Sequence, residues 1–171
     1  MVTYFEGAQT MHTLLLQGMQ NGADMPLWLA AFLAGSFAAV AMDALMLAVR
    51  LSVHSPFSMP VIVGSVLLPW GRPRERRTLG TAVHLLVGSL LGLAFWWLSE
   101  TTQFGTLPVA LASTIFALGL WFFLGTVVLP LARRGLMGAR IDDFAWAISL
   151  LGHLVCALVF TTLLPFIFLS H

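Results

Sequence analysis

Four long apolar stretches dominate the chain, and each is long enough to cross the hydrocarbon of a lipid bilayer. They lie at residues 27–49, 79–98, 108–131 and 144–168. A helical crossing needs about 20 predominantly apolar residues. Only 9% of the 171 residues are charged, whereas 59% are hydrophobic, which leaves too little polar surface for a soluble globule. The sequence therefore predicts an all-α integral membrane protein with one four-helix transmembrane domain.

Two further segments contact the membrane in this interpretation without crossing it. Between the first two spans, residues 55–70 hold an apolar run that is bracketed by prolines and too short to span, which predicts an interfacial or re-entrant segment. The sequence then continues into a basic loop at residues 71–77. Residues 1–26 lack the basic region of a cleaved signal peptide. Their apolar side chains recur at helical intervals, which suits an amphipathic segment on the membrane surface, and a loosely ordered tail is the alternative.

The arginines predict the orientation of the four spans. All eight basic residues are arginines, and all fall in the first and third connections: Arg50, Arg72, Arg74, Arg76, Arg77, Arg133, Arg134 and Arg140. By the positive-inside rule, these connections face the cytoplasm and both termini face the periplasm or cell exterior. We therefore expect a multi-pass protein of a bacterial or archaeal cytoplasmic (inner) membrane. The chain has no basic stripe with interleaved aromatic residues, so we expect no nucleic-acid partner.

One carboxylate, Asp43, lies within the first span. Ala31, Gly35, Ala39 and Asp43 recur every four residues and therefore share one face of a helix. Small residues on such a face let a second helix backbone approach closely, which is a common basis of helix association in lipid. We expect Asp43 to face protein, because an acid exposed to hydrocarbon costs several kcal/mol (~3) unless it is neutralised or paired.

Two histidines in other spans are the predicted partners of this acid. Asp43 precedes Arg50 by seven residues and His84 follows Arg77 by seven, so both lie about 10 Å inside the same boundary. His153 in the fourth span lies roughly one helical turn deeper. The sequence thus predicts a polar cluster of Asp43, His84 and His153 in the arginine-bearing half of the bundle.

Three interpretations of this cluster remain open. In the first, the cluster is structural: Asp43 and His84 share an interhelical hydrogen bond, and His153 is bonded to a backbone carbonyl or to Ser149. In the second, His84 and His153 are the two axial ligands of a b-type haem, and Asp43 orients one imidazole. In the third, the three groups belong to a small proton or ion transporter. Cys156 is interpreted as a packing residue.

A few details bear on the choice among these three. His84-Leu-Leu-Val and His153-Leu-Val form a short internal similarity, which would place the histidines face to face if the two halves were a parallel repeat. Gly88 and Gly152 would give a porphyrin room, or equally suit tight helix packing. The outer half of the spans offers few polar residues for a continuous ion path. Glu-x-x-His pairs are absent, so we expect no carboxylate-bridged metal centre.

The motifs also carry a resemblance. Met42-Asp43, Met59-Pro60 with Gly64, His84 with Gly88, and Gly152-His153 stand in order along the chain. This pattern resembles a poorly characterised group of small four-span membrane proteins of bacteria and archaea, over roughly residues 30–165. The resemblance supplies no established activity. It implies that the Asp/His pattern is a shared feature, and that such proteins work beside respiratory or other electron-transfer complexes.

No nucleophile–base pair and no phosphate-binding loop is recognisable, so we expect no enzyme activity and no catalytic residues. The favoured hypothesis is a non-catalytic accessory subunit of a larger membrane complex, of respiratory, photosynthetic or other electron-transfer type. Its expected partners are the lipid bilayer and other membrane subunits. The haem-binding subunit and the transporter are the alternatives.

Overall fold

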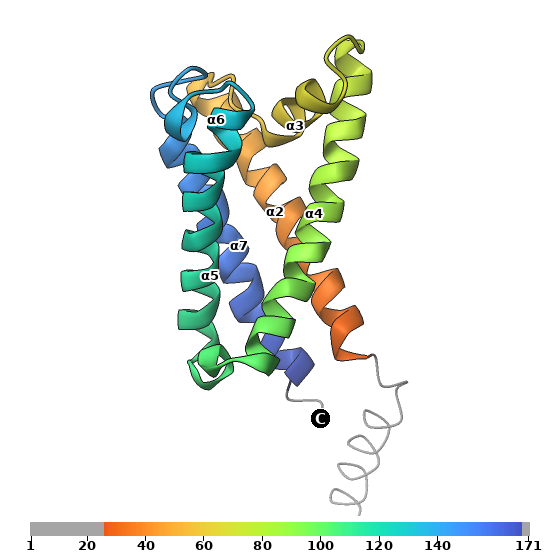
Figure 1. The fold of residues 1–171 in the computed structure, drawn as a ribbon, viewed down its shortest axis with the longest axis vertical. Coiled ribbons are helices and arrows are strands. Elements are labelled where there is room, and N and C mark those ends of the chain that lie inside the picture. The colour runs from red at the N-terminus through yellow and green to blue at the C-terminus, as the bar shows by residue number, and fades with distance from the viewer. Residues whose placement is uncertain (1–25, 169–171) are drawn as a thin grey trace, which may run out of the picture.

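The computed structural model describes residues 26–168, and all regular secondary structure in this range is helical (Figure 1). Four helices are long and apolar enough to cross a membrane, which confirms the predicted fold class. The elements are α2 (Leu27–Val53), α3 (Met59–Leu67), α4 (Pro73–Thr101), η1 (Gln103–Thr106), α5 (Val109–Phe123), η2 (Leu124–Val128), α6 (Leu129–Leu131), η3 (Leu136–Gly138) and α7 (Ala145–Phe168). Apart from Pro26, the amphipathic segment expected at residues 1–26 lies outside the described residues.

The second span begins earlier than the sequence predicts. Helix α4 starts at Pro73, so the basic stretch expected as a loop forms its first turns. Proline suits the first position of a helix because the amide hydrogen that it lacks would have no partner there. The Glu75 carboxylate accepts a hydrogen bond from the backbone N–H of Arg72 at 2.8 Å and closes the helix start. Helix α4 therefore extends beyond the apolar stretch, and arginines lie on its first turns.

The third span is not one regular helix as expected. Its end contains the π-helical turn η2 before the short helix α6. Pro130 cannot donate a backbone hydrogen bond, and its ring would clash with the carbonyl four residues earlier. On both sides of Pro130, a backbone hydrogen bond spans five residues instead of the usual four. The N–H of Leu129 donates to the carbonyl of Leu124, and the N–H of Arg134 donates to the carbonyl of Leu129 at 2.8 Å. The π turn accommodates the proline without ending the span.

Helices α2 and α4 pack backbone against backbone along the predicted small-residue face. A side chain at Gly35 would collide with the backbone of Gly88 and Gly92, and one at Gly92 would collide with the carbonyl of Ala31. A Cβ at Gly88 would come within 2.6 Å of the Ala39 Cβ. These residues therefore set how closely the two helices approach.

The remaining helices extend this pair into an open bundle. Helix α2 also packs on α7, and α7 packs on α5, so that α4 and α5 lie at the two ends of the row. At the lower end of Figure 1 these two outer helices meet through Phe95, whose ring centroid lies 5.2 Å from that of Phe116 and 5.3 Å from that of Phe160. Toward the upper end, α4 and α5 diverge (Figure 1). This asymmetric packing does not match a simple parallel repeat of the two halves.

All eight arginines lie at the upper end of the bundle, where α2 ends and α4 begins; we call it the arginine-rich end (Figure 1). Polar contacts hold its segments together. The Arg134 guanidinium donates to the Ser65 hydroxyl of α3 at 2.7 Å. The Ser55 hydroxyl donates to the Asp142 carboxylate, which also accepts the backbone N–H of Phe144 at 3.0 Å. These two hydrogen bonds, the one from Phe144 first, lower the pKa of Asp142 below its usual value.

Replacement of Gly35 by leucine tests whether the α2–α4 contact stabilises the fold. The new side chain has no space against Gly88 and Gly92, so Gly35→Leu is expected to destabilise the protein by roughly 1–3 kcal/mol. Gly119→Leu is the matched control, because a Cβ at Gly119 meets nothing within 4 Å. Unfolding by a denaturing detergent, followed by circular dichroism, measures both. Equal stability of the two variants would contradict the proposed role of the contact.

Candidate functional site

The structure brings Asp43 and His84 together across the α2–α4 contact. The His84 Nδ1 atom lies 3.1 Å from the Asp43 Oδ1 atom, and the two side chains are 13% and 22% exposed, respectively. The expected hydrogen bond is nevertheless not formed. Both atoms are buried without a hydrogen-bond partner, because the direction of the ring N–H misses the carboxylate oxygen. The pair is thus a close polar contact that a small rotation of either side chain would turn into a hydrogen bond.

His153 is buried on α7, and its Nδ1 atom lies 2.8 Å from the backbone carbonyl oxygen of Ser149. This is the backbone partner expected for a structural histidine. Because a carbonyl oxygen can only accept a hydrogen bond, the proton of the neutral ring lies on Nδ1. The Nε2 atom then carries a free electron pair.

Both histidines line one cavity of about 370 Å³, which we call the central cavity. Its walls come from α2, α3, α4, α5, η2 and α7, and it lies in the region where α4 and α5 diverge (Figure 1). Apart from His84, His153 and the Cys156 thiol, its lining is apolar. Two of the lining side chains, Val87 on α4 and Phe123 on α5, are 44% and 55% exposed, so the cavity is open to its surroundings beside these residues. The cavity therefore borders the lipid between these two helices.

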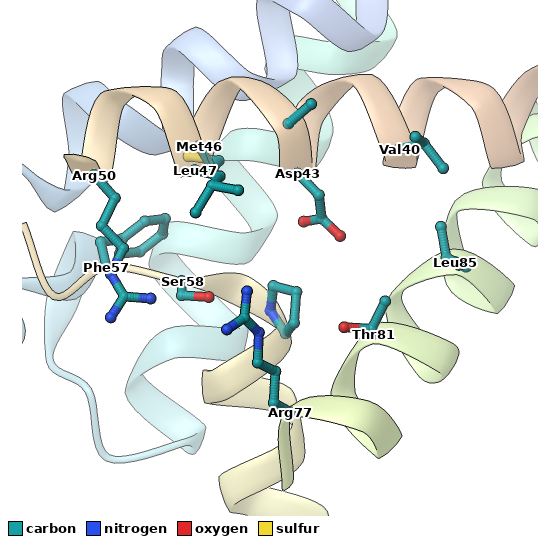
Figure 2. Close-up of a pocket in the computed structure, with 12 residues that line it drawn as sticks. Val40, Asp43, Met46, Leu47, Arg50, Phe57, Ser58, Arg77, Thr81 and Leu85 are labelled. Atoms are coloured by element: carbon teal, nitrogen blue, oxygen red, sulfur yellow. The ribbon is translucent and has the colours of Figure 1, made fainter. Parts of the chain in front are cut away.

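A second pocket, of about 320 Å³, lies on the other side of Asp43. We call it the arginine pocket, because Arg50 and Arg77 line it from α2 and α4. Figure 2 shows both guanidinium groups directed into the space between these helices, with Asp43 farther along α2. Asp43 lines this pocket and His84 lines the central cavity, so their contact forms part of the wall between the two.

The arrangement of the two imidazoles suits the binding of an electron-pair acceptor. Each Nδ1 atom lies close to an oxygen: that of His84 is 3.1 Å from the Asp43 carboxylate without a hydrogen bond, and that of His153 is hydrogen-bonded to a backbone carbonyl. Histidines that bind a metal commonly have such an oxygen at the second ring nitrogen, because it orients the ring and raises the basicity of the ligating nitrogen. Neither Nε2 atom has a hydrogen-bond partner among residues 26–168. A metal centre held by three or more His, Cys, Asp or Glu side chains is absent from this part of the chain.

The sequence predicted Asp43 and His84 at one level and His153 about one helical turn deeper, but it did not predict the cavity. The cavity depends on the divergence of α4 and α5 and on residues of α3 and η2, including Met59 and Val128. The π turn at Pro130 was the available signal, since such turns are frequent at functional sites. Cys156, interpreted as a packing residue, is one of the residues that line the cavity.

The glycines that were considered as space for a porphyrin serve helix packing. A Cβ at Gly152 would collide with Met46 and lie 3.0 Å from the Met42 Cγ atom. Gly88 lines the cavity, but a side chain at this position would also collide with Ala39 of α2. Space beside the histidines therefore comes from the separation of α4 and α5.

Comparisons with known proteins complete this description. No protein-family model, no curated protein and no solved structure matches the chain. The interpretation of the site therefore rests on its own geometry.

Proposed function

We propose that this chain is a non-enzymatic electron-transfer subunit that holds a b-type haem in the central cavity, with His84 and His153 as axial ligands. The observation that carries the proposal is that two imidazoles from different helices share one lipid-bordered cavity, each with an oxygen at Nδ1. A bound haem would supply one-electron chemistry at a potential set by its ligands and surroundings. Asp43 would orient His84, and the Ser149 carbonyl would fix the tautomer of His153.

The size and lining of the cavity support a flat, apolar cofactor. Its volume lies near the lower end of the range of small-molecule sites, which is about 300–1,000 Å³. A macrocycle would extend from the cavity into the opening between α4 and α5, where Val87 and Phe123 supply an apolar border. Its edge would then be accessible to lipid-soluble carriers or to neighbouring subunits.

Transport is supported less well by the polar groups of the lower half of the bundle. The Ser36 and Ser89 hydroxyls lie 2.6 Å apart, and the Ser113 and Thr161 hydroxyls lie 2.8 Å apart. Each hydroxyl also lies within hydrogen-bond distance of a backbone carbonyl of its own helix, so in each pair one hydroxyl can donate to the other while the second donates to its carbonyl. The hydrogen bonds of these hydroxyls therefore connect neighbouring helices. Within residues 26–168 they form no path that leads on from His153 to the lower end of the bundle.

The small extramembrane part of the described chain supports a role within a larger complex. The connections at residues 102–108 and 132–144 are short, and residues 26–168 contain no domain outside the bundle. An electron donor or acceptor would therefore be another protein or a lipid-soluble carrier. This supports the proposal that the chain works with other membrane subunits, as its resemblance to a poorly characterised group of small four-span membrane proteins also implies.

The proposed orientation places the arginine-rich end in the cytoplasm of a bacterium or archaeon, because cytoplasmic connections are enriched in basic residues. Alkaline phosphatase fused after His171 is expected to be active, since the enzyme folds only outside the cytoplasm. A fluorescent protein that folds only in the cytoplasm should remain dark at the same position. Fluorescence without phosphatase activity would contradict this orientation.

Purification of the full chain from its native membranes in a mild detergent tests the cofactor and the complex together. The absorption spectrum is expected to show a haem Soret band that shifts on reduction. His84→Asn and His153→Asn are each expected to abolish or strongly alter it, because each removes an axial ligand. His54→Asn is the matched control, since His54 is exposed and lies outside the cavity, and asparagine tolerates its left-handed backbone (φ 54°).

The two proposals fail separately in this experiment. A preparation without a Soret band, or with a band that survives both cavity variants, would contradict the haem site. Native mass spectrometry of the same preparation is expected to show additional subunits bound to the chain. A stable lone monomer would contradict the role within a complex, whatever the spectrum shows.

A further inference from the structure

The arginine pocket is separate from the cavity proposed for the haem, and its lining combines two arginines with apolar side chains. Its polar part comprises Arg50, Arg77, Ser58 and Thr81, contributed by α2, α4 and the start of α3. Val40 and Leu85 lie at the opposite end of the pocket from Arg50 in Figure 2, whereas the apolar side chains of Leu47 and Phe57 lie beside Arg50. A pocket that combines two cationic groups with apolar side chains matches a molecule with an anionic head and a hydrocarbon tail.

The two arginines of the pocket have no polar partner within the described chain. Arg76 and Arg134 each donate a hydrogen bond, to the Pro69 carbonyl and the Ser65 hydroxyl respectively. Arg50 and Arg77 have no ion pair or side-chain hydrogen bond among residues 26–168. Two guanidinium groups that converge on one space present several N–H donors, which suits a phosphate group.

The pocket opens along the exposed side of α2. Val40 is 52% exposed and Leu47 is 45% exposed, and both line the pocket. On a membrane-spanning helix such side chains face hydrocarbon. An acyl chain can therefore run from the two arginines along α2 without leaving the lipid phase.

One carboxylate, that of Asp43, also lines the pocket. Asp43 lies seven residues before Arg50 on α2, which places it about 10 Å farther from the arginine-rich end. It contacts His84 at 3.1 Å instead of either arginine. A phosphate held between Arg50 and Arg77 would therefore lie at the membrane surface, and Asp43 would lie at the depth of the acyl chains.

We propose that the arginine pocket binds one anionic glycerophospholipid, with its phosphate between Arg50 and Arg77 and an acyl chain along Val40 and Leu47. Basic pockets between transmembrane helices on the cytoplasmic side commonly bind anionic lipid headgroups. The bound lipid would close the gap between the end of α2 and the start of α4. The proposal does not depend on the presence of haem.

Native mass spectrometry of the full chain in a neutral detergent tests this site. Dioleoyl phosphatidylglycerol is added in one arm, dioleoyl phosphatidylcholine in a second and glycerol 3-phosphate in a third. We expect a single high-affinity adduct with phosphatidylglycerol and much weaker binding in the other two arms. Equal binding of the two lipids would overturn the proposal, and strong binding of glycerol 3-phosphate would assign the pocket to a soluble phosphate compound instead.

Charge-matched variants locate the lipid. Arg50→Gln combined with Arg77→Gln is expected to weaken phosphatidylglycerol binding about 30-fold, from the attraction of two arginines near a membrane surface. Arg133→Gln combined with Arg140→Gln removes the same charge at the same end of the bundle, outside the pocket, and is expected to leave binding within about 3-fold of wild type. Equal losses in the two double variants would indicate general charge attraction and contradict the site.

A steric variant keeps the proposal testable if the arginine variant fails to fold. Ala44 lines the pocket from the exposed side of α2, so Ala44→Trp fills the space without removing either arginine. It is expected to abolish the high-affinity adduct while circular dichroism reports unchanged helix content. Retention of the adduct at wild-type affinity would show that the lipid binds elsewhere.

Discussion

The close approach of α2 and α4 is the contact on which the rest of the structure depends. Gly35, Gly88 and Gly92 have no side chains that would separate the two backbones, and in lipid such packing replaces the hydrophobic effect as a source of helix association. Eight residues beyond Gly35 on the same helix, the close spacing brings Asp43 within 3.1 Å of His84. The spacing of the backbones thus determines whether the acid has a partner at membrane depth.

The bundle is open on one side, between α4 and α5. Helix α2 packs on α4 and α7, and α7 packs on α5, while α4 and α5 meet mainly through the aromatic rings around Phe95. Above these rings the two outer helices separate and leave the central cavity between them. His84 enters this cavity from α4 and His153 from α7. One tight interface and one open interface therefore account together for the candidate site.

Patterns within single helices were predictable from the sequence, whereas relations between helices were not. The spans, the small-residue face ending at Asp43 and the backbone bond of His153 follow from apolar length and four-residue spacing. The helical start at Pro73, the π turn before Pro130 and the divergence of α4 and α5 depend on capping and tertiary packing. Residue depth brought Asp43 and His84 to one level, but the direction of a ring N–H depends on side-chain angles that no sequence pattern specifies.

Electron paramagnetic resonance of the oxidised, purified protein tests the central claim most directly, because it reports the axial ligands of a haem. Two imidazoles, His84 and His153, predict a low-spin ferric signal. Replacement of either histidine by asparagine should convert it to a high-spin signal, since one strong ligand is lost. A wild-type protein with no haem signal, or with a low-spin signal that persists without these two histidines, would contradict the account.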